Sequence, residues 1–420
     1  MFSIFRSLKS RNYRLYFIGQ SLSLTGTWMQ GVAMGWLVYR LTGSPLMLGL
    51  VAFASQIPGF FLTTVGGVLA DRYNRHRILI LTQSLSMLQA TLLAVLVLTG
   101  RVEFWHLMVL GLLIGTINAF DMPTRHAFVV EMLDDRQDIG NALALNSSMI
   151  NAARLIGPSI AGILIASVGE GICFLINAVS FLAVITSLLL MKITPVIKAP
   201  DSTTVWQQMK TGFSYVFGFA PVKYLITLLA FVGLVGMPYG TLLPIFAKDI
   251  LHGSSRTLGF LMGATGIGAL AGVVFLARRK TVLGLGKVIV MASLVFGLGL
   301  MGLALSTVFW LSLVFMLLIG FGMMVQWVSC NTILQTMVED DMRGRVMSFY
   351  VLSFLGVTPP GNLLAGAAAG WIGADYTLLI SGLLCVTAAF FFARKLPAMR
   401  QMVRPIYLRK GILTESHTNT

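Results

Sequence analysis

A group of charges in this sequence lies in a short polar break between two long apolar stretches. The break reads Gly67-Val68-Leu69-Ala70-Asp71-Arg72-Tyr73-Asn74-Arg75-His76-Arg77. An Asp at the end of one helix can pair with an Arg or cap the start of a neighbouring helix. A loop that only orients the chain at a membrane surface needs the Arg residues but not the Asp. We therefore expect Asp71 to make a specific contact, and Gly67 to let two helices approach closely.

A second charge, Arg154, lies inside an apolar stretch that begins near Ala142. At about 1.5 Å of helix per residue it lies near the centre of a bilayer, where a charge is costly and usually faces a partner or a water-filled cavity. Two interpretations remain open. Arg154 either binds an anionic or catecholate-like group of a substrate, or it belongs to a structural pair inside the protein.

Three residues are candidates for carrying a proton: Asp121, Glu131 and His106. Asp121 stands at the edge of an apolar stretch in the sequence Asp121-Met-Pro123-Thr-Arg125, so it can equally pair with Arg125 in its own helix. The first apolar stretch contains no Asp or Glu.

Amides and one Trp inside the apolar stretches are candidates for lining a substrate cavity, because an amide that faces lipid is unfavourable. Together with Arg154, the predicted cavity residues are Gln20, Trp28, Asn146, Asn151, Gln326 and Asn331.

The composition excludes a soluble protein. Hydrophobic residues make up 56% of the 420 residues and charged ones 11%. Unpaired peptide groups are costly in lipid, so such a chain crosses a membrane as helices or as a closed barrel, and apolar runs of roughly 20 residues indicate helices. The three Cys lie inside apolar runs, and we find no phosphate-cradling loop, metal motif or nucleophile elbow. We expect no metal, no cofactor and no enzymatic activity.

The sequence predicts an all-α membrane protein with 12 transmembrane helices. The expected spans are 13–39, 46–70, 78–99, 104–124, 142–168, 172–191, 222–246, 258–277, 287–306, 308–330, 347–370 and 376–393. With the N-terminus inside, almost all of the 30 Lys and Arg lie on the inner side; the exceptions are Arg40, Arg101, Arg154, Lys248 and Arg256. The positive-inside rule then places both termini in the cytoplasm, with the first span kept as an uncleaved anchor. The net charge of +15 is therefore a signal of topology and of lipid headgroups, and we expect no nucleic-acid partner.

The polar segment 192–221 divides these spans six and six. We expect an N-terminal half at 1–191, a cytoplasmic linker at 192–221 whose later part lies on the membrane surface, a C-terminal half at 222–395 and a cytoplasmic tail at 396–420. Internal similarity supports two related halves. Leu48-Gly49 recurs as Leu258-Gly259, Gly162 recurs as Gly366, and Val130-Glu131 recurs as Val338-Glu339.

The loop from Gly67 to Arg77 resembles the loop between helices 2 and 3 of the major facilitator superfamily of transporters, although Asn74 and His76 depart from the usual residues. The resemblance implies two six-helix halves with a substrate site between them. It also implies a conformational latch, in which Gly67, Asp71, Arg72, Arg75 and Arg77 contact the other half and stabilise the outward-facing state. The corresponding loop of the second half keeps Gly272 and Arg278-Arg279-Lys280 but has no Asp.

Three further stretches resemble narrower groups of this superfamily. Gly157-Pro158 followed by Ala161-Gly162 is similar to the helix 5 motif of its antiporters, which implies that Gly157, Pro158 and Gly162 allow bending. Asp121 to Arg125, Asn151 to Gly162 and Asp341 to Arg345 resemble the bacterial group of the enterobactin exporter and macrolide efflux proteins.

The resemblance implies a secondary active transporter, acting as a monomer in the bacterial inner membrane, that exports a bulky, partly aromatic siderophore or drug. Alternatives are a broad-specificity multidrug/proton antiporter, with protons as the coupling ion, and a membrane sensor or scaffold that moves nothing.

Overall fold

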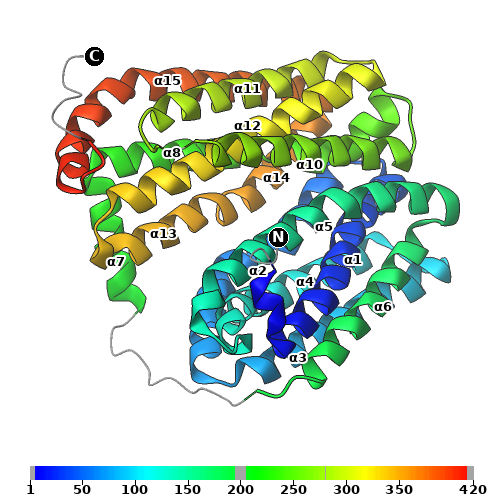
Figure 1. Cartoon of the computed structure of the whole chain (residues 1–420). Helices are drawn as coiled ribbons and strands as arrows, with labels where there is room; N and C mark the ends of the chain where they lie inside the picture. Colours follow the sequence, from blue (N-terminus) through cyan, green and yellow to red (C-terminus); the bar gives the residue numbers. More distant parts are fainter. Residues whose placement is uncertain (1–4, 194–204, 280, 414–420) are drawn as a thin grey trace. The chain divides into compact units, whose positions relative to one another are not determined.

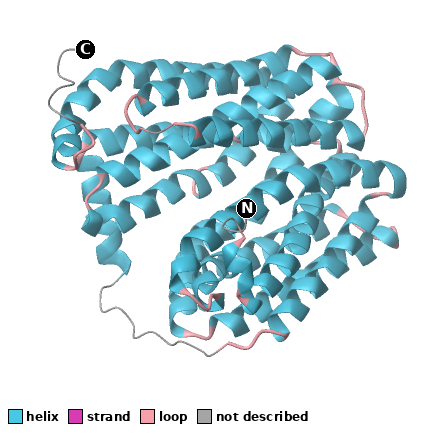
Figure 2. Ribbon diagram, in the orientation of Figure 1, coloured by secondary structure: helices cyan, strands magenta, loops and turns pink. Residues whose placement is uncertain are grey.

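The computed structural model describes residues 5–193, 205–279 and 281–413. Every regular element in these ranges is helical (Figure 2). The helices follow the chain from blue to red in Figure 1. They are α1 (Arg11–Thr42), α2 (Pro45–Arg72), α3 (Arg75–Leu98), α4 (Phe104–Phe128), α5 (Ile139–Val168), α6 (Glu170–Leu189), α7 (Val205–Gly218), α8 (Ala220–Val235), α9 (Tyr239–Ile245), α10 (Ser255–Ala277), α11 (Leu285–Leu305), α12 (Phe309–Met337), α13 (Asp340–Leu355), α14 (Thr358–Ile372) and α15 (Ala374–Arg409).

Eleven helical stretches of the described chain are long and apolar enough to cross a membrane. The first predicted span, α1, is 32 residues long but is not among them, because its Gln, Ser and Thr residues lower its hydropathy. The all-α membrane class is confirmed.

Two predicted spans are each built from more than one helix. The span expected at 222–246 consists of α8, α9 and a π-helical turn at Phe246–Ile250, and the span expected at 347–370 consists of α13 and α14. The last span continues to Arg409, beyond its expected end at 393. Within the linker, α7 forms a helix where the sequence predicts a surface segment.

Contacts divide the chain into two units. Unit 1 contains α1 to α6 together with Gly240–Gly266 and Asn362–Ala374, whereas unit 2 contains α7, α8, Ile267–Gly361 and the chain from Asp375 onward. Unit 1 thus includes one end of α10 and most of α14. The division into two six-helix halves at the linker stays a prediction.

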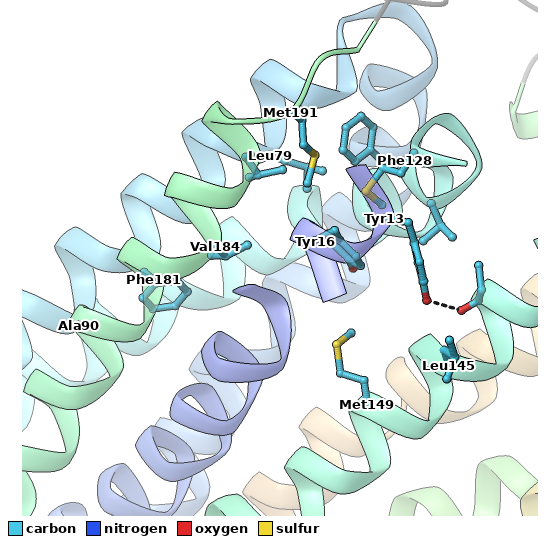
Figure 3. Packing of buried hydrophobic residues seen from close by; sticks show 14 of the residues in the cluster. Tyr13, Tyr16, Leu79, Ala90, Phe128, Leu145, Met149, Phe181, Val184 and Met191 are labelled. Atoms are coloured by element: carbon cyan, nitrogen blue, oxygen red, sulfur yellow. Dashed lines mark hydrogen bonds between the residues drawn. The ribbon is translucent and has the colours of Figure 1, made fainter. Parts of the chain in front are cut away.

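The core of unit 1 is apolar and aromatic (Figure 3). Tyr13 and Tyr16 of α1 lie among Leu79, Phe128 and Phe181 from three other helices. Tyr13 is fully buried, and its hydroxyl donates a 2.7 Å hydrogen bond to the carbonyl of Ala142. This bond ties α1 to α5 near one end of the bundle.

A chain of buried amides joins four helices of the same unit. Gln30 of α1 donates to Gln89 of α3 at 3.0 Å and accepts from Asn177 of α6 at 2.8 Å. Gln89 in turn donates to the carbonyl of Leu110 in α4. Gly26 permits the close α1–α6 approach, because a Cβ there would lie 2.5 Å from the amide oxygen of Asn177. Small residues and interhelical amides are the usual means of packing helices in lipid.

Candidate functional site

The charged loop is organised around Arg75. Its guanidinium makes ion pairs with Asp71 at 2.7 Å and with Glu131 at 2.6 Å, and its Nε donates to the carbonyl of Ala70. The side chain of Asp71 is 68% exposed, whereas those of Arg75 and Glu131 are only 10% and 12% exposed. Glu131, predicted as a proton carrier, is therefore brought together with the predicted latch residues. Arg75 fastens the turn after α2 to the short helix Val129–Met132 that follows α4.

Within unit 1 the close helix contact is made at Gly66, and the role of Gly67 in the latch stays a prediction. A Cβ at Gly67 would meet no described atom within 4 Å, whereas one at Gly66 would collide with the backbone of Ala119 and Phe120 in α4. Successive helical residues point about 100° apart, so a motif read by spacing can select the neighbouring glycine. Arg72 and Arg77 are exposed, and the side chain of Asn74 caps α3 by accepting from the N–H of Arg77.

Asp121 lies in a buried polar cluster and is 2% exposed. One carboxylate oxygen accepts from Thr82 at 2.8 Å and from Gln83 at 2.7 Å, and the other accepts from Arg125 at 2.5 Å. Asp121 therefore makes the local pair with Arg125 that the sequence allows, and its role as a proton carrier stays a prediction. The hydroxyl of Tyr16 and the Nε of Arg125 are buried and have no partner within residues 5–193, 205–279 and 281–413.

His106, the third predicted proton carrier, caps a helix. Its Nδ1 accepts the backbone N–H of Glu103 at 3.0 Å at the start of α4, and its ring stacks on Trp105. The three proton candidates therefore lie at three separate places in unit 1, paired with Arg125, Arg75 and the helix start.

The predicted cavity residues of unit 1 have different surroundings. Arg154 lies over the ring of Trp28, with 5.0 Å between its guanidinium carbon and the ring centroid. Gln20 and Asn146 are buried, and the amide oxygen of Asn146 has no partner among the described residues. Asn151 donates to the carbonyl of Ser147 in its own helix.

Two further predicted cavity residues belong to unit 2. Gln326 is fully buried in α12, and both polar atoms of its amide lack a partner in the part of the chain that the structure describes. Asn331 accepts from Gln335 one turn later.

The predicted bending residues of α5 are contact points. The helix continues through Pro158. A Cβ at Gly157 would lie 2.6 Å from the Cβ of Trp28, and one at Gly162 would lie 2.8 Å from the Cα of Gly259. These glycines allow α5 to approach α1 and α10.

Two glycine contacts in unit 1 join repeat-related residues. Gly162 of α5 meets Gly259 of α10, and Gly49 of α2 meets Gly366 of α14, where a Cβ at Gly49 would lie 3.1 Å from the Cα of Gly366. In sequence, Gly49 corresponds to Gly259 and Gly162 to Gly366. The contact between Gly49 and Gly366 is therefore the repeat-related counterpart of the contact between Gly259 and Gly162. Beside them, Ser255 donates to the carbonyl of Gly162, and the hydroxyl of Tyr39 bonds to Asp249.

A cavity of about 310 Å³ lies in unit 1 among α1, α2, α4 and α9. Among the described residues that line it, none is charged. Its polar lining consists of Thr27, Gln30, Ser55, Gln56, Asn118 and Thr241. Sequence reasoning did not assign Gln56 or Asn118 to a cavity. The available signal was the spacing of Thr27, Gly31, Met34 and Val38, which places them along one face of α1.

The chain was compared with known proteins. The family described as "Transmembrane secretion effector" matches residues 2–407. The staphyloferrin A transporter of Staphylococcus aureus is 27% identical, covering 91% of this chain and 96% of that protein. The multidrug efflux pump Tap of Mycolicibacterium fortuitum is 27% identical (88% and 92%), and the enterobactin exporter EntS of Escherichia coli is 24% identical (88% and 87%).

Solved structures support the fold. The nucleoside transporter NupG aligns with a TM-score of 0.71 at 14% identity over 92% of this chain and 98% of that one. A bacterial homologue of the iron transporter ferroportin, described in an inward-facing state, aligns at 0.69 with 18% identity over 91% and 98%.

This chain belongs to the transmembrane secretion effector family of the major facilitator superfamily. It is a multi-pass membrane transporter and not an enzyme. The resemblance inferred from the loop and helix motifs is confirmed.

The Asp121 cluster makes a first prediction. Asp121→Asn leaves the buried guanidinium of Arg125 without its counter-charge, so we expect a loss of about 3–5 kcal/mol of stability. Arg125→Gln alone should be similarly destabilising, whereas the double variant Asp121→Asn/Arg125→Gln should recover most of the loss. Thermal unfolding of the purified protein in detergent measures this, with Thr116→Val, whose hydroxyl bonds only to its own helix, as the control. Additive losses in the double variant would contradict the pairing.

Proposed function

We propose that this chain is a secondary active exporter that moves a bulky, partly aromatic small molecule, a siderophore or a drug, across the bacterial inner membrane by alternating access. The observation that carries the proposal is the uncharged cavity of unit 1. Three relatives support the proposal, because proteins that are similar to this chain along almost their whole length are named as a staphyloferrin A transporter, a multidrug efflux pump and an enterobactin exporter.

The lining of this cavity suits an aromatic, hydrogen-bonding compound. Amides of Gln56 and Asn118 and the hydroxyl of Thr241 supply donors and acceptors, while Met34 and neighbouring aliphatic side chains supply adaptable apolar surface. A formal charge in such a cavity would lose its hydration without gaining a counter-charge. The neutral, aromatic part of a substrate is therefore the part that this cavity binds.

Alternating access requires contacts that close one side and then release. We assign the two glycine contacts to the outer side, in agreement with the topology that places both termini in the cytoplasm. The latch of Gly67, Asp71, Arg72, Arg75 and Arg77 would act on the inner side and stabilise the outward-facing state. In this scheme the protein works as a monomer in the lipid bilayer, with small molecules and protons as its partners.

A broad-specificity multidrug/proton antiporter is the second candidate. The buried carboxylate of Asp121 favours it, because a carboxylate enclosed by donors inside a membrane protein can exchange a proton when its pairing changes. Glu131 and His106 are the remaining proton candidates of this version.

Flux in proteoliposomes tests export directly. We expect saturable movement of an uncharged aromatic probe, either the dye Nile red or the catechol 2,3-dihydroxybenzamide. Gln56→Leu and Asn118→Leu should each lower the rate at least roughly tenfold by removing hydrogen bonds to the probe. Thr116→Val, on the opposite face of α4 from Asn118, should transport normally. A proton gradient that leaves the rate unchanged would count against proton coupling, and no flux of either probe would favour the scaffold alternative.

The glycine contacts make a separate prediction. Gly49→Leu and Gly162→Leu should force these helix ends apart, because each added side chain meets the backbone of a facing helix. We expect at least a roughly tenfold faster reaction of Thr241→Cys, a cavity residue, with a membrane-impermeant maleimide added outside. Gly59→Leu is the matched control in α2, since a Cβ at Gly59 meets only Thr63 of its own helix within 4 Å among described atoms. If Thr241→Cys reacted at the same rate in the Gly49→Leu, Gly162→Leu and Gly59→Leu proteins, the glycine contacts would not close the outer side.

The latch is tested by Asp71→Asn. The carboxylate is largely exposed, so loss of its pair with Arg75 should cost no more than about 1 kcal/mol of stability. We therefore expect normal protein amounts but reduced export, with Asp71→Glu retaining part of the rate. Export by Asp71→Asn at the wild-type rate would show that Asp71 does not form a latch.

A further inference from the structure

The two repeat-related loops treat their arginines differently. In the first half, Arg75 is held between the carboxylates of Asp71 and Glu131. In the second half, Arg279 stands 204 residues later, the same offset that separates Gly162 from Gly366. Within the described part of the chain, Arg279 makes no ion pair. Its Nη2 donates to the carbonyl of Leu283 at 3.0 Å, and its Nε is buried without a partner.

A cavity of about 460 Å³ lies beside this guanidinium in unit 2, among α10, the start of α11 and α12. Aliphatic side chains, including Val273, Leu276 and Val328, form much of its wall. Ser329 also lines it. This serine is 1% exposed, and its hydroxyl has no partner among the described residues. The cavity wall therefore contains two donors, the Nε of Arg279 and the hydroxyl of Ser329, that the described part of the chain does not satisfy.

Other polar groups of the wall are already used. Thr332 donates to the carbonyl of Val328, Thr336 donates to the carbonyl of Thr332, and the hydroxyl of Thr281 accepts the N–H of Leu283. Buried donors without partners are costly. Arg279 and Ser329 are thus the groups that a ligand would satisfy.

The two donors stand near one level of α10 and α12. Gly268 of α10 lies against Leu317 of α12, and Gly272 lies against Phe321, so facing residues of the two helices differ by 49 positions. This offset places Arg279, two residues beyond the end of α10, beside the level of Ser329. Val273 stands six residues earlier in the chain, about 9 Å further along α10 at about 1.5 Å per residue. A molecule whose anionic head meets both donors therefore has an aliphatic wall along which an apolar chain can extend.

We propose that this cavity binds an anionic amphiphile. Its phosphate or carboxylate pairs with the guanidinium of Arg279, a geometry that arginine favours. An ester or hydroxyl oxygen accepts from Ser329, and the apolar chain lies against Val273 and Val328. The ligand supplies the negative charge that Asp71 and Glu131 supply to Arg75 in the first half. Two sources share this chemistry, an anionic phospholipid of the surrounding membrane and an acidic amphiphile that the protein transports. The site does not depend on the proposed direction of transport.

Binding to the purified full-length protein in a neutral detergent tests the site. Dodecyl phosphate should raise the thermal unfolding temperature saturably, whereas dodecanol and inorganic phosphate at equal concentration should not. Arg279→Gln should weaken the apparent affinity roughly ten- to a hundredfold, and Ser329→Ala about fivefold, as expected for a charge-assisted and a neutral hydrogen bond. Arg278→Gln, the exposed neighbour, is the matched control and should bind as the wild type does.

Arg279→Lys separates binding from folding, because it keeps the charge and should retain part of the affinity that Arg279→Gln loses. Native mass spectrometry of protein incubated with phosphatidylglycerol or phosphatidylcholine distinguishes the sources. Retention of phosphatidylglycerol by wild type and Arg278→Gln but not Arg279→Gln identifies a lipid. Binding of dodecyl phosphate without retention of either lipid identifies a transported acid. Equal binding by Arg279→Gln and wild type, or equal stabilisation by dodecanol, overturns the proposal.

Discussion

The structure depends on one constraint: a polar group that leaves water inside a membrane is stabilised only by partners within the protein. Gln30, Gln89 and Asn177 satisfy one another across α1, α3 and α6, and Asp121 takes donors from α3 and from Arg125. Lipid offers no substitute for these partners. This pairing fixes the rotation of α1 about its own axis, and Thr27, Gly31 and Met34 then line the cavity of unit 1.

The repeat-related residues of the chain divide into those that pack and those that carry charge. The packing residues are preserved, because Gly49, Gly162, Gly259 and Gly366 make the same backbone contact twice. The charged loops have diverged. Arg75 keeps two carboxylates, whereas Arg279 has only the carbonyl of Leu283 as a partner in the described chain. The shapes of the facing helices constrain the packing residues in both halves. A charge inside a membrane protein is costly, so it is kept where it has a partner or a functional role.

Sequence reasoning reached the helical membrane class and the family because long apolar runs and the Gly67 to Arg77 motif are local signals. It missed the helix breaks at Gly236 and Gly356, since the apolar run continues across both and hides the change of direction. Gln56 and Asn118 were missed for a related reason. A helix that is apolar on every side shows no face by composition, so only three-dimensional packing separates cavity from lipid.

Charge placement also limits what the proposed exporter can bind. The cavity of unit 1 has no charged lining among its described residues, and the guanidinium of Arg154 lies over the ring of Trp28. The face of the indole ring attracts this cation. A cavity lined by amides and hydroxyls then discriminates by shape and hydrogen bonding instead of by net charge. The apolar part of this lining discriminates weakly between aromatic compounds of similar size, which is why a siderophore and a drug are compatible with the same site, whereas the amides favour compounds that can form hydrogen bonds.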